Sequence, residues 1–166
     1  MNPHTPKPII GWTEYIDFPQ WEIVGLEAKV DTGARTSAIH VENLEAISHD
    51  RVRFEIMTGR KRPFRRKSVE SKILKWARVR SSTGVYTERC FVRAQVKIGP
   101  IVKNIEVSLV CRGTMQFRML LGRTAIEHDF LVDVSKRKAI TSRPKKKAAS
   151  ALKPITKPKH PPHSAH

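Results

Sequence analysis

Residues 29–38, Lys-Val-Asp-Thr-Gly-Ala-Arg-Thr-Ser-Ala, place one carboxylate at a tight turn between two short strands. The first strand is expected at 26–30, and Thr36 begins the second. Gly33 supplies the free backbone torsions that such a turn needs. Hydroxyl and backbone N–H groups near Asp31 can keep its carboxylate ionised and fixed in direction. The stretch therefore predicts a rigid loop that presents Asp31 to a cleft.

The rest of the chain consists of short apolar segments separated by turn residues, with almost no helical periodicity. Strands are expected at 9–17, 26–30, 36–42, 52–56, 75–80, 85–98, 101–110, 117–121 and 130–134. One short helix is expected at 124–128. Many short strands with turn signals and so little helix favour an all-β, barrel-like domain.

Two motifs carry a resemblance to a known fold. Asp31-Thr32-Gly33-Ala34 resembles the active-site loop of the retropepsin-type aspartic proteases, and Met119-Leu120-Leu121-Gly122-Arg123 resembles their second hallmark. Together with Gly11–Tyr15 and Arg78–Gly84, they resemble a bacterial retropepsin-like family known as ATP-dependent zinc proteases, often encoded beside ATP-grasp amino-acid ligases. The resemblance covers residues 10–133. It implies a closed or partly open barrel of the retropepsin-like acid protease type, with one short helix after the Leu-Leu-Gly-Arg motif.

The resemblance also implies catalysis by two carboxylates that share one proton. One Asp-Thr-Gly supplies only one carboxylate, so a homodimer is expected. The implied catalytic residues are Asp31, Thr32 and Gly33, supported by a structural motif of Leu121, Gly122 and Arg123. Two other interpretations remain open. In the first, Asp31 is a structural turn residue. In the second, the loop belongs to a non-catalytic protease fold that is used for binding.

Arg35 departs from the viral retropepsins, in which an acid just after Asp-Thr-Gly-Ala can pair with the arginine of the Gly-Arg motif. Arg35 and Arg123 have like charges, so this ion pair cannot form. Because arginine forms forked hydrogen bonds with carboxylates, Arg35 is expected to bind a substrate carboxylate. The expected substrate-binding residues are Ala34, Arg35, Arg78, Arg80, Ser82 and Arg89. The alternative is that Arg35 pairs with Glu27, Glu42 or another acid of the fold.

Residues 75–80 and 85–98 form an expected hairpin whose turn is Ser81-Ser82-Thr83-Gly84. The resemblance makes this hairpin a candidate for the flap that folds over a retropepsin active site. The alternative is an ordinary meander hairpin. The segment 59–67 is too charged to be buried and predicts an exposed basic loop.

The family name refers to zinc and ATP, but the sequence contains no motif that would bind either of them. The sequence has no His-Glu-x-x-His helix, no Cys-x-x-Cys pair and no Gly-x-x-x-x-Gly-Lys-Ser/Thr loop. We therefore expect no metal site and no cofactor, and an ATP site, if one is involved, on a partner ligase.

The formal net charge is +17, and the C-terminal tail carries more than half of the excess. Residues 1–8 and 141–166 are expected to be disordered, and residues 9–140 to form the retropepsin-like domain. The basic tail is expected either to bind nucleic acid without sequence specificity or to remain simply solvated. The chain has no apolar run of membrane-spanning length, no stretch of the signal-peptide kind and no cysteine framework. We therefore expect a cytoplasmic protein that does not associate with membranes.

The sequence thus predicts a retropepsin-like aspartic peptidase that acts on an acidic or glutamylated protein tail in association with an ATP-grasp ligase. The alternative is a non-catalytic binding module of the same fold that docks on a ligase, a ribosomal protein or RNA.

Overall fold

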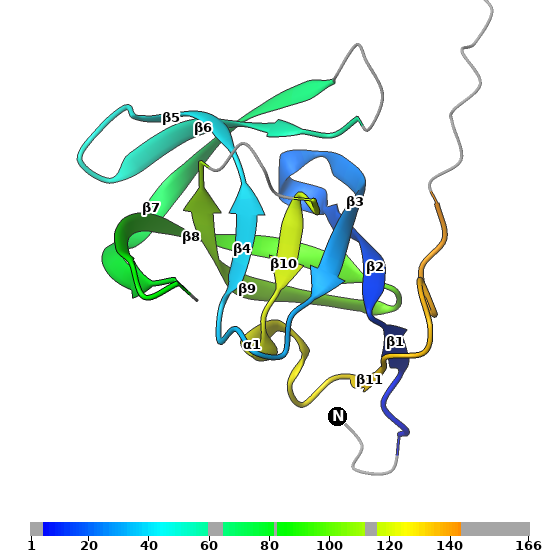
Figure 1. The fold of residues 1–166 in the computed structure, drawn as a ribbon. Coiled ribbons are helices and arrows are strands. Elements are labelled where there is room, and N and C mark those ends of the chain that lie inside the picture. Colours follow the sequence, from blue (N-terminus) through cyan, green and yellow to red (C-terminus); the bar gives the residue numbers. More distant parts are fainter. Residues whose placement is uncertain (1–4, 60–64, 82, 112–115, 144–166) are drawn as a thin grey trace, which may run out of the picture.

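The computed structural model describes residues 5–59, 65–81, 83–111 and 116–143. Over these residues it contains eleven strands, one 3-10 helix and one short α-helix (Figure 1). The elements are β1 Ile9–Gly11, β2 Thr13–Phe18, the 3-10 helix η1 Pro19–Trp21, β3 Ile23–Val30, β4 Ser37–His40, β5 Glu42–Ala46, β6 Arg51–Met57, β7 Arg66–Arg80, β8 Tyr86–Ile98, β9 Ile101–Val110, β10 Met119–Leu121, α1 Arg123–Ile126 and β11 Leu131–Asp133. The prediction of an all-β fold with a short helix after the Leu-Leu-Gly-Arg motif is confirmed. Neither of the helices in these ranges is long and apolar enough to cross a membrane.

The main sheet closes on itself through hydrogen bonds. Within the described chain, β2, β3, β10, β4, β9 and β8 are bonded in this order, and β8 returns to β2 through the pair Asp17 and Lys97. The strands β7, β6 and β5 continue the sheet outward from β8. The ring encloses much of the hydrophobic core, to which Val52, Phe54 and Ile56 of β6 and Val69 of β7 also contribute, and the outward extension projects from the ring (Figure 1).

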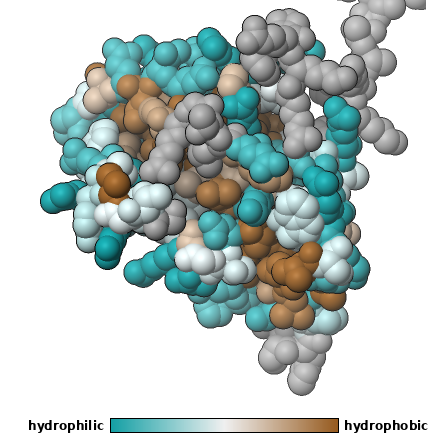
Figure 2. Space-filling view, viewed as in Figure 1, coloured by the Kyte–Doolittle hydropathy of each residue, from teal (hydrophilic) through white to brown (hydrophobic). Residues whose placement is uncertain are grey.

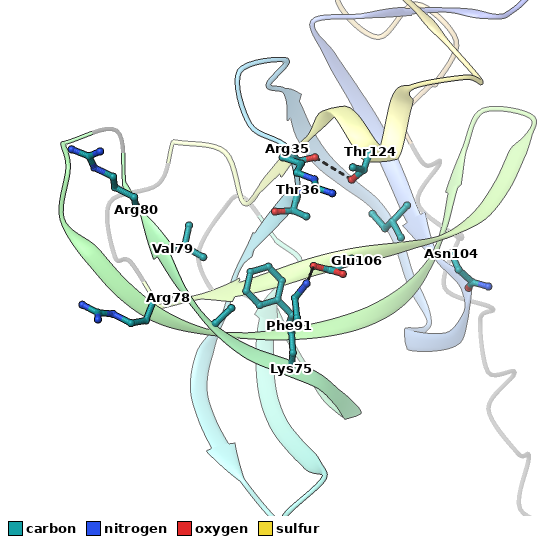
Figure 3. A pocket seen from close by; sticks show the side chains of 12 residues that line it. Arg35, Thr36, Lys75, Arg78, Val79, Arg80, Phe91, Asn104, Glu106 and Thr124 are labelled. Atoms are coloured by element: carbon teal, nitrogen blue, oxygen red, sulfur yellow. Dashed lines mark hydrogen bonds and ion pairs between the residues drawn. The ribbon is translucent and has the colours of Figure 1, made fainter.

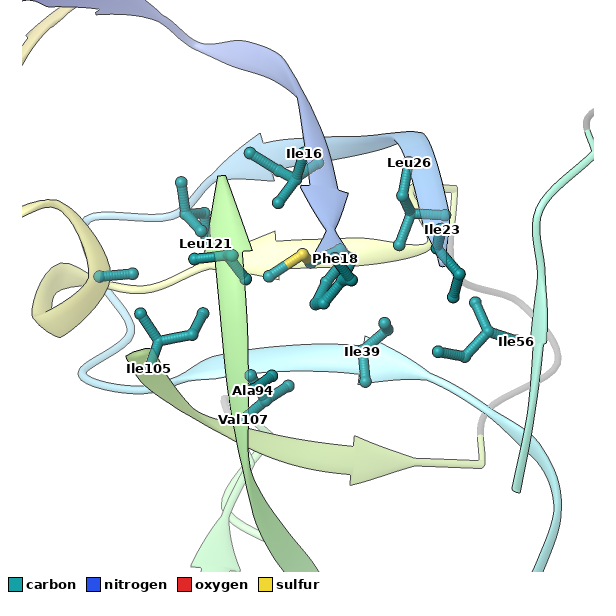
Figure 4. Close-up of a cluster of buried hydrophobic side chains, with 14 of the residues drawn as sticks. Ile16, Phe18, Ile23, Leu26, Ile39, Ile56, Ala94, Ile105, Val107 and Leu121 are labelled. Atoms are coloured by element: carbon teal, nitrogen blue, oxygen red, sulfur yellow. The ribbon is translucent and has the colours of Figure 1, made fainter. Parts of the chain in front are cut away.

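The core is built from alternate residues of the ring strands (Figure 4). Along β8, alternate residues are buried, namely Cys90, Val92, Ala94, Val96 and Ile98. Such alternation is the side-chain period of a strand with one buried face. Phe18 stacks on Trp21 with ring centroids 4.9 Å apart, and Trp21 meets the ring of Phe54 edge-on at 5.6 Å. These aromatic contacts join the ring of strands to β6.

The predicted strand 9–17 is wrong in one respect, because Trp12 interrupts it. The N–H group of Trp12 donates to the carbonyl of Lys136 at 2.9 Å, and its carbonyl accepts from Val30 N–H at 2.9 Å. The adjacent Gly11 has to be glycine, because a Cβ there would lie 2.5 Å from the Lys136 carbonyl oxygen. The chain therefore forms two short strands, β1 and β2, on either side of Trp12.

The last strand also differs from the prediction. A strand was expected at 130–134 as part of one barrel-like domain, and β11 forms there but pairs in parallel with β1 in a separate two-stranded sheet. This pairing places Ile9 opposite Leu131. A buried carboxylate, Glu14, fixes the chain that follows β11 by accepting backbone hydrogen bonds from Ala139, at 2.7 Å, and Thr141, at 3.2 Å.

Three further boundaries differ from the predicted ones. The strand expected at 36–42 ends at His40, and β5 begins at Glu42 as a new strand paired with β6. The strand expected to begin at 75 begins at Arg66, because the surface segment before it pairs with β6. The helix α1 ends at Ile126, and His128 has a positive φ of 71° that no continuing α-helix could hold.

Parts of the other predictions lie outside the described residues. These are most of the basic loop expected at 59–67, half of the N-terminal segment 1–8 and most of the tail 141–166.

Candidate active site

The loop after β3 holds the carboxylate of Asp31 in place through its own backbone. Asp31 Oδ1 accepts hydrogen bonds from the N–H groups of Gly33, at 3.1 Å, and Ala34, at 3.3 Å. The N–H group of Asp31 donates to the carbonyl of Leu121 at 2.9 Å. Asp31 is partly exposed and Thr32 is exposed. The loop therefore presents a directed carboxylate at the surface, with backbone N–H groups as its donors.

The predicted structural motif, Leu121, Gly122 and Arg123, lies directly against this loop. The strand β10 runs parallel to β3 on one side and antiparallel to β4 on the other, so it fills the space between the two strands that flank Asp31. A Cβ at Gly122 would lie 2.5 Å from the carbonyl carbon of Thr36. Only glycine allows this approach without a backbone shift. Two distant parts of the sequence thus form one packed unit.

Arg123 braces the loop from the start of α1. Its Nη1 donates to the carbonyls of Thr32, at 2.9 Å, and Gly33, at 3.1 Å. Its backbone N–H donates to the carbonyl of Ala34 at 2.9 Å. Thr124 continues this contact, because its N–H and hydroxyl groups both donate to the carbonyl of Arg35 at 3.0 Å. Arg123 has the same charge as Arg35 and cannot pair with it. Arg123 instead binds backbone carbonyls of the Asp31 loop.

A cleft of about 610 Å³ lies between this loop and the β7–β8 hairpin (Figure 3). It is lined by Arg35, Thr36, Lys75, Ala77, Arg78, Val79, Arg80, Phe91, Asn104, Ile105, Glu106 and Thr124. Of the predicted substrate-binding residues, the cleft thus brings Arg35, Arg78 and Arg80 together. The lining residues of β9 were not predicted, because nothing in the sequence relates that strand to residues 35 and 36.

The two sides of the hairpin carry different groups. Val79 and Phe91 are turned toward the cleft, whereas the guanidinium groups of Arg78 and Arg80 point away from it (Figure 3). This direction follows from the alternation of side chains along β7. Arg78 and Arg80 therefore border the cleft but present their charges on the opposite side of the hairpin.

Arg89 lies elsewhere. It lines a second groove of about 200 Å³ together with Trp76, Cys90 and Cys111, and its Nε donates to Thr87 Oγ1 at 3.3 Å. The prediction grouped Arg89 with Arg78 and Arg80, but the structure places it in a different depression. Ala34 is in the Asp31 loop, and Ser82 lies outside the described residues.

Positive side chains near the cleft outnumber the carboxylates that could pair with them. Lys75 forms an ion pair with Glu106 at 2.7 Å and lies 5.0 Å from the centroid of the Phe91 ring. Among the described residues, no carboxylate pairs with the guanidinium groups of Arg35, Arg78 or Arg80. These three arginines carry positive charge that the described part of the fold leaves uncompensated.

The alternative partners suggested for Arg35 are engaged by other cations. Glu27 is buried and lies 3.1 Å from Lys138 Nζ, and Glu42 lies 3.1 Å from Arg66 Nη2. The interpretation of Arg35 as a structural partner of Glu27, Glu42 or another acid of the fold stays a prediction.

The donor groups near Asp31 do not fit a zinc ion. Zinc in proteins takes histidine nitrogen, cysteine sulfur and carboxylate oxygen, and the described residues contain no cluster of three or more such side chains. The two cysteines are both free, Cys90 buried and Cys111 exposed, and burial raises the pKa of each thiol. His40 is buried, and this burial lowers its pKa.

A ring of strands that holds Asp-Thr-Gly against a Leu-Leu-Gly-Arg strand defines the class of retropepsin-like proteins. The chain belongs to the family described as retropepsin-like aspartic endopeptidase RimB, whose model matches residues 9–144. This assignment confirms the resemblance to a retropepsin-like group.

Several curated relatives are named "Probable alpha-L-glutamate ligase". The chain is 36% identical over 135 residues to the one from Shewanella halifaxensis. The aligned region covers 78% of this chain and 29% of that protein. The chain is 34% identical over 141 residues to the one from Desulfotalea psychrophila, covering 80% of this chain and 29% of that protein. The chain thus spans about three tenths of the length of the curated relatives it matches.

The fold is also found among solved structures. One such structure is that of a protein of unknown function from Legionella pneumophila. It has a TM-score of 0.67 and 24% sequence identity, and the match covers 82% of this chain and all of that one.

Proposed function

We propose that this protein is an aspartic-type peptidase that cleaves an acidic or glutamylated protein tail, in association with an ATP-grasp ligase. The observation that carries the proposal is the Asp31 loop. Its carboxylate is directed by the N–H groups of Gly33 and Ala34, and the backbone of the loop is braced by Arg123. Membership of a retropepsin-like endopeptidase family supports assigning peptide hydrolysis to this loop.

Hydrolysis needs a second carboxylate, and a second copy of the chain would supply it. In such a dimer the two Asp31 groups share one proton, since two adjacent carboxylates cannot both ionise. The ionised group takes a proton from water, whose oxygen attacks the scissile carbonyl, while the protonated group donates to the carbonyl oxygen. The tetrahedral intermediate then collapses as its C–N bond breaks and the amine leaves with a proton.

An apolar surface near the loop supports such an association. Ile9, Leu131 and Val134 are exposed large apolar residues of β1, β11 and the turn that follows. Apolar side chains gather over these two strands in the space-filling view (Figure 2). The patch adjoins the Asp31 loop, since Trp12 follows β1 and accepts the hydrogen bond of Val30. Contiguous apolar patches of this kind mark interaction surfaces, and a second copy here would approach the loop.

The charge of the site supports an acidic substrate. Arg35 lines the cleft, and Arg78 and Arg80 present their charges on the other side of the hairpin that borders it; none of the three has a carboxylate partner among the described residues. A peptide with several carboxylates would neutralise this charge through forked hydrogen bonds. The names of the relatives support a link with ligases that add glutamate, because a segment similar to this chain forms part of proteins named for that activity.

The test compares wild-type protein with Asp31→Asn on peptides that end in several glutamates and on neutral peptides of the same length. We expect cleavage of the acidic peptides by the wild type, detected by mass spectrometry, and none by Asp31→Asn. Asp17→Asn is the matched control, because it makes the same chemical change on β2. Equal cleavage by Asp31→Asn would refute the aspartic mechanism. Light scattering should find a dimer at the concentrations where the protein cleaves.

Arg35→Ala tests the substrate class separately. It should weaken cleavage of acidic peptides and leave neutral peptides unaffected, and equal loss on both would refute the role of Arg35. The alternative function, a non-catalytic module that docks on an acidic partner, is favoured by the same unpaired arginines. It predicts that Asp31→Asn binds acidic peptides normally while the wild type cleaves none.

A further inference from the structure

Tyr86 organises two arginines on the side of the hairpin that faces away from the cleft. The guanidinium carbon of Arg78 lies 5.3 Å from the centroid of the Tyr86 ring, and that of Arg80 lies 5.9 Å from it. The register explains both contacts, because Arg80 is directly opposite Tyr86 and Arg78 is its diagonal neighbour. We call Arg78, Arg80 and Tyr86 the arginine comb.

The comb is open to solvent and unneutralised. Tyr86 is 55% exposed, and both arginines are exposed. Glu88 lies directly opposite Arg78 in the ladder, yet no ion pair joins them in the described part of the chain. Both guanidinium groups lie at the tyrosine ring instead.

The turn beside the comb requires a glycine. Gly84 has a positive φ of 83°, and a Cβ there would already lie 3.7 Å from Arg80 Nη2. The turn itself is held by hydrogen bonds from Gly84 N–H to the carbonyl of Ser81, at 2.9 Å, and from Ser81 N–H to the carbonyl of Val85, at 2.8 Å. The positive φ is the reason for a glycine at this turn, because other residues rarely adopt it.

The spacing of the comb matches one class of ligand. Arg78 and Arg80 are two residues apart on one strand, a separation of ~6.6 Å along the strand axis. An extended peptide has the same spacing between side chains at positions i and i+2, which share one side. Adjacent side chains point to opposite sides, so they cannot both reach the comb.

We propose that the arginine comb binds an extended acidic segment and selects carboxylates two residues apart. Tyr86 is then a positioning residue, which holds both guanidinium groups at its ring through cation–π contacts. This inference rests on the proposed function in taking the acidic tail as the ligand. It adds a binding surface on the far side of the hairpin from the cleft that contains Arg35.

The test is a competition assay with the Asp31→Asn protein, so that cleavage cannot interfere. Fluorescein-labelled decaglutamate is the probe, followed by anisotropy. Three capped peptides in an alanine–serine background compete with it, each with two glutamates separated by zero, one or two residues. The peptide with one intervening residue should compete about fivefold more strongly, as expected for one added contact between exposed charges.

Variants in the same Asp31→Asn background test the role of Tyr86. Tyr86→Phe keeps a ring and should keep the preference, whereas Tyr86→Leu should abolish it. Arg78→Gln should abolish it as well. Lys72→Gln is the matched control, because it removes one charge from the same strand outside the cleft, and it should leave the preference intact.

The outcomes separate this inference from the proposed function. Equal competition by the three peptides, or no binding of decaglutamate, would overturn the arginine comb. Cleavage of acidic peptides by the wild type together with equal competition would leave the proposed function standing and remove only the comb. A spacing preference without any cleavage would support the comb and count against the peptidase.

Discussion

Replacing Glu14 with glutamine should destabilise the fold by removing a buried acceptor. Glu14 is fully buried. Its Oε1 accepts from the N–H groups of Gly11, at 2.8 Å, Ala139, at 2.7 Å, and Ile140, at 3.4 Å. Its Oε2 accepts from the N–H and hydroxyl groups of Thr141. A single carboxylate thus ties the start of β2 to the chain that follows β11.

The magnitude follows from these contacts. Glu14→Gln keeps the shape but puts an NH2 group where one oxygen faced N–H donors, so at least one buried donor loses its acceptor. The remaining bonds change from charge-assisted to neutral and become roughly half as strong. Together these effects should cost about 3 kcal/mol of unfolding free energy. For a chain of this size that corresponds to a fall in Tm of about 9 °C.

Urea and thermal unfolding, followed by circular dichroism, would measure the loss. Asp17→Asn is the matched control. Asp17 Oδ1 accepts a single hydrogen bond, from Gly25 N–H at 2.8 Å, and an amide oxygen can still accept it. The control should therefore lose less than about 1 kcal/mol. An equal loss in the two variants would refute the argument that the buried set of donors requires a carboxylate.

Three other predictions concern the site and its supports. Gly122→Ala should cost about 1–3 kcal/mol in urea unfolding and about 100-fold in peptide cleavage, because its Cβ would displace the Thr36 backbone and with it the Asp31 loop. Arg123→Met should lower cleavage about tenfold with little change in Tm, since Arg123 is exposed but holds two carbonyls of the loop. Burial, and to a lesser degree Arg118, lowers the pKa of His40 below 6.5. The unfolded chain then binds a proton at a higher pH than the folded chain, so the unfolding free energy should fall as pH drops from about 7 through the folded pKa. His40→Gln should flatten that fall in urea titrations.

The Asp31 loop was predictable because its determinants are local. Gly33 and Ala34, the donors to the carboxylate, lie within three residues of it, whereas the support from Leu121 and Arg123 comes from far along the chain. The interruption at Trp12 was not predictable in this way. Its two hydrogen-bond partners, Val30 and Lys136, are far along the chain, and only the folded topology brings them to it.

The position of Arg89 shows how one residue in a turn alters a site. The predicted turn at 81–84 would pair Arg80 with Val85 and therefore Trp76 with Arg89, on the same side of the hairpin as Arg78. The observed register pairs Arg80 with Tyr86 and Ala77 with Arg89. A shift of one residue moves a side chain to the other face of a strand, so Arg89 lies on the face of Ala77 and not on that of Arg78, and this register does not account for its place in the second groove. The exposed sequence around the turn contains no apolar pattern that could fix this register in advance.

The contacts that hold the described Asp31 loop all lie within one chain. Its carboxylate is bound by its own backbone, its carbonyls by Arg123, and its N–H group by the carbonyl of Leu121. A second copy would therefore join a loop that is already formed and would add chiefly the second carboxylate. A single copy would keep the arginines and one directed Asp31 but lack the proton-sharing pair, so it could bind an acidic segment without cleaving it. Under the proposed function, the peptidase and the binding module would then be two oligomeric states of the same folded unit, and the association between copies would decide which of them acts.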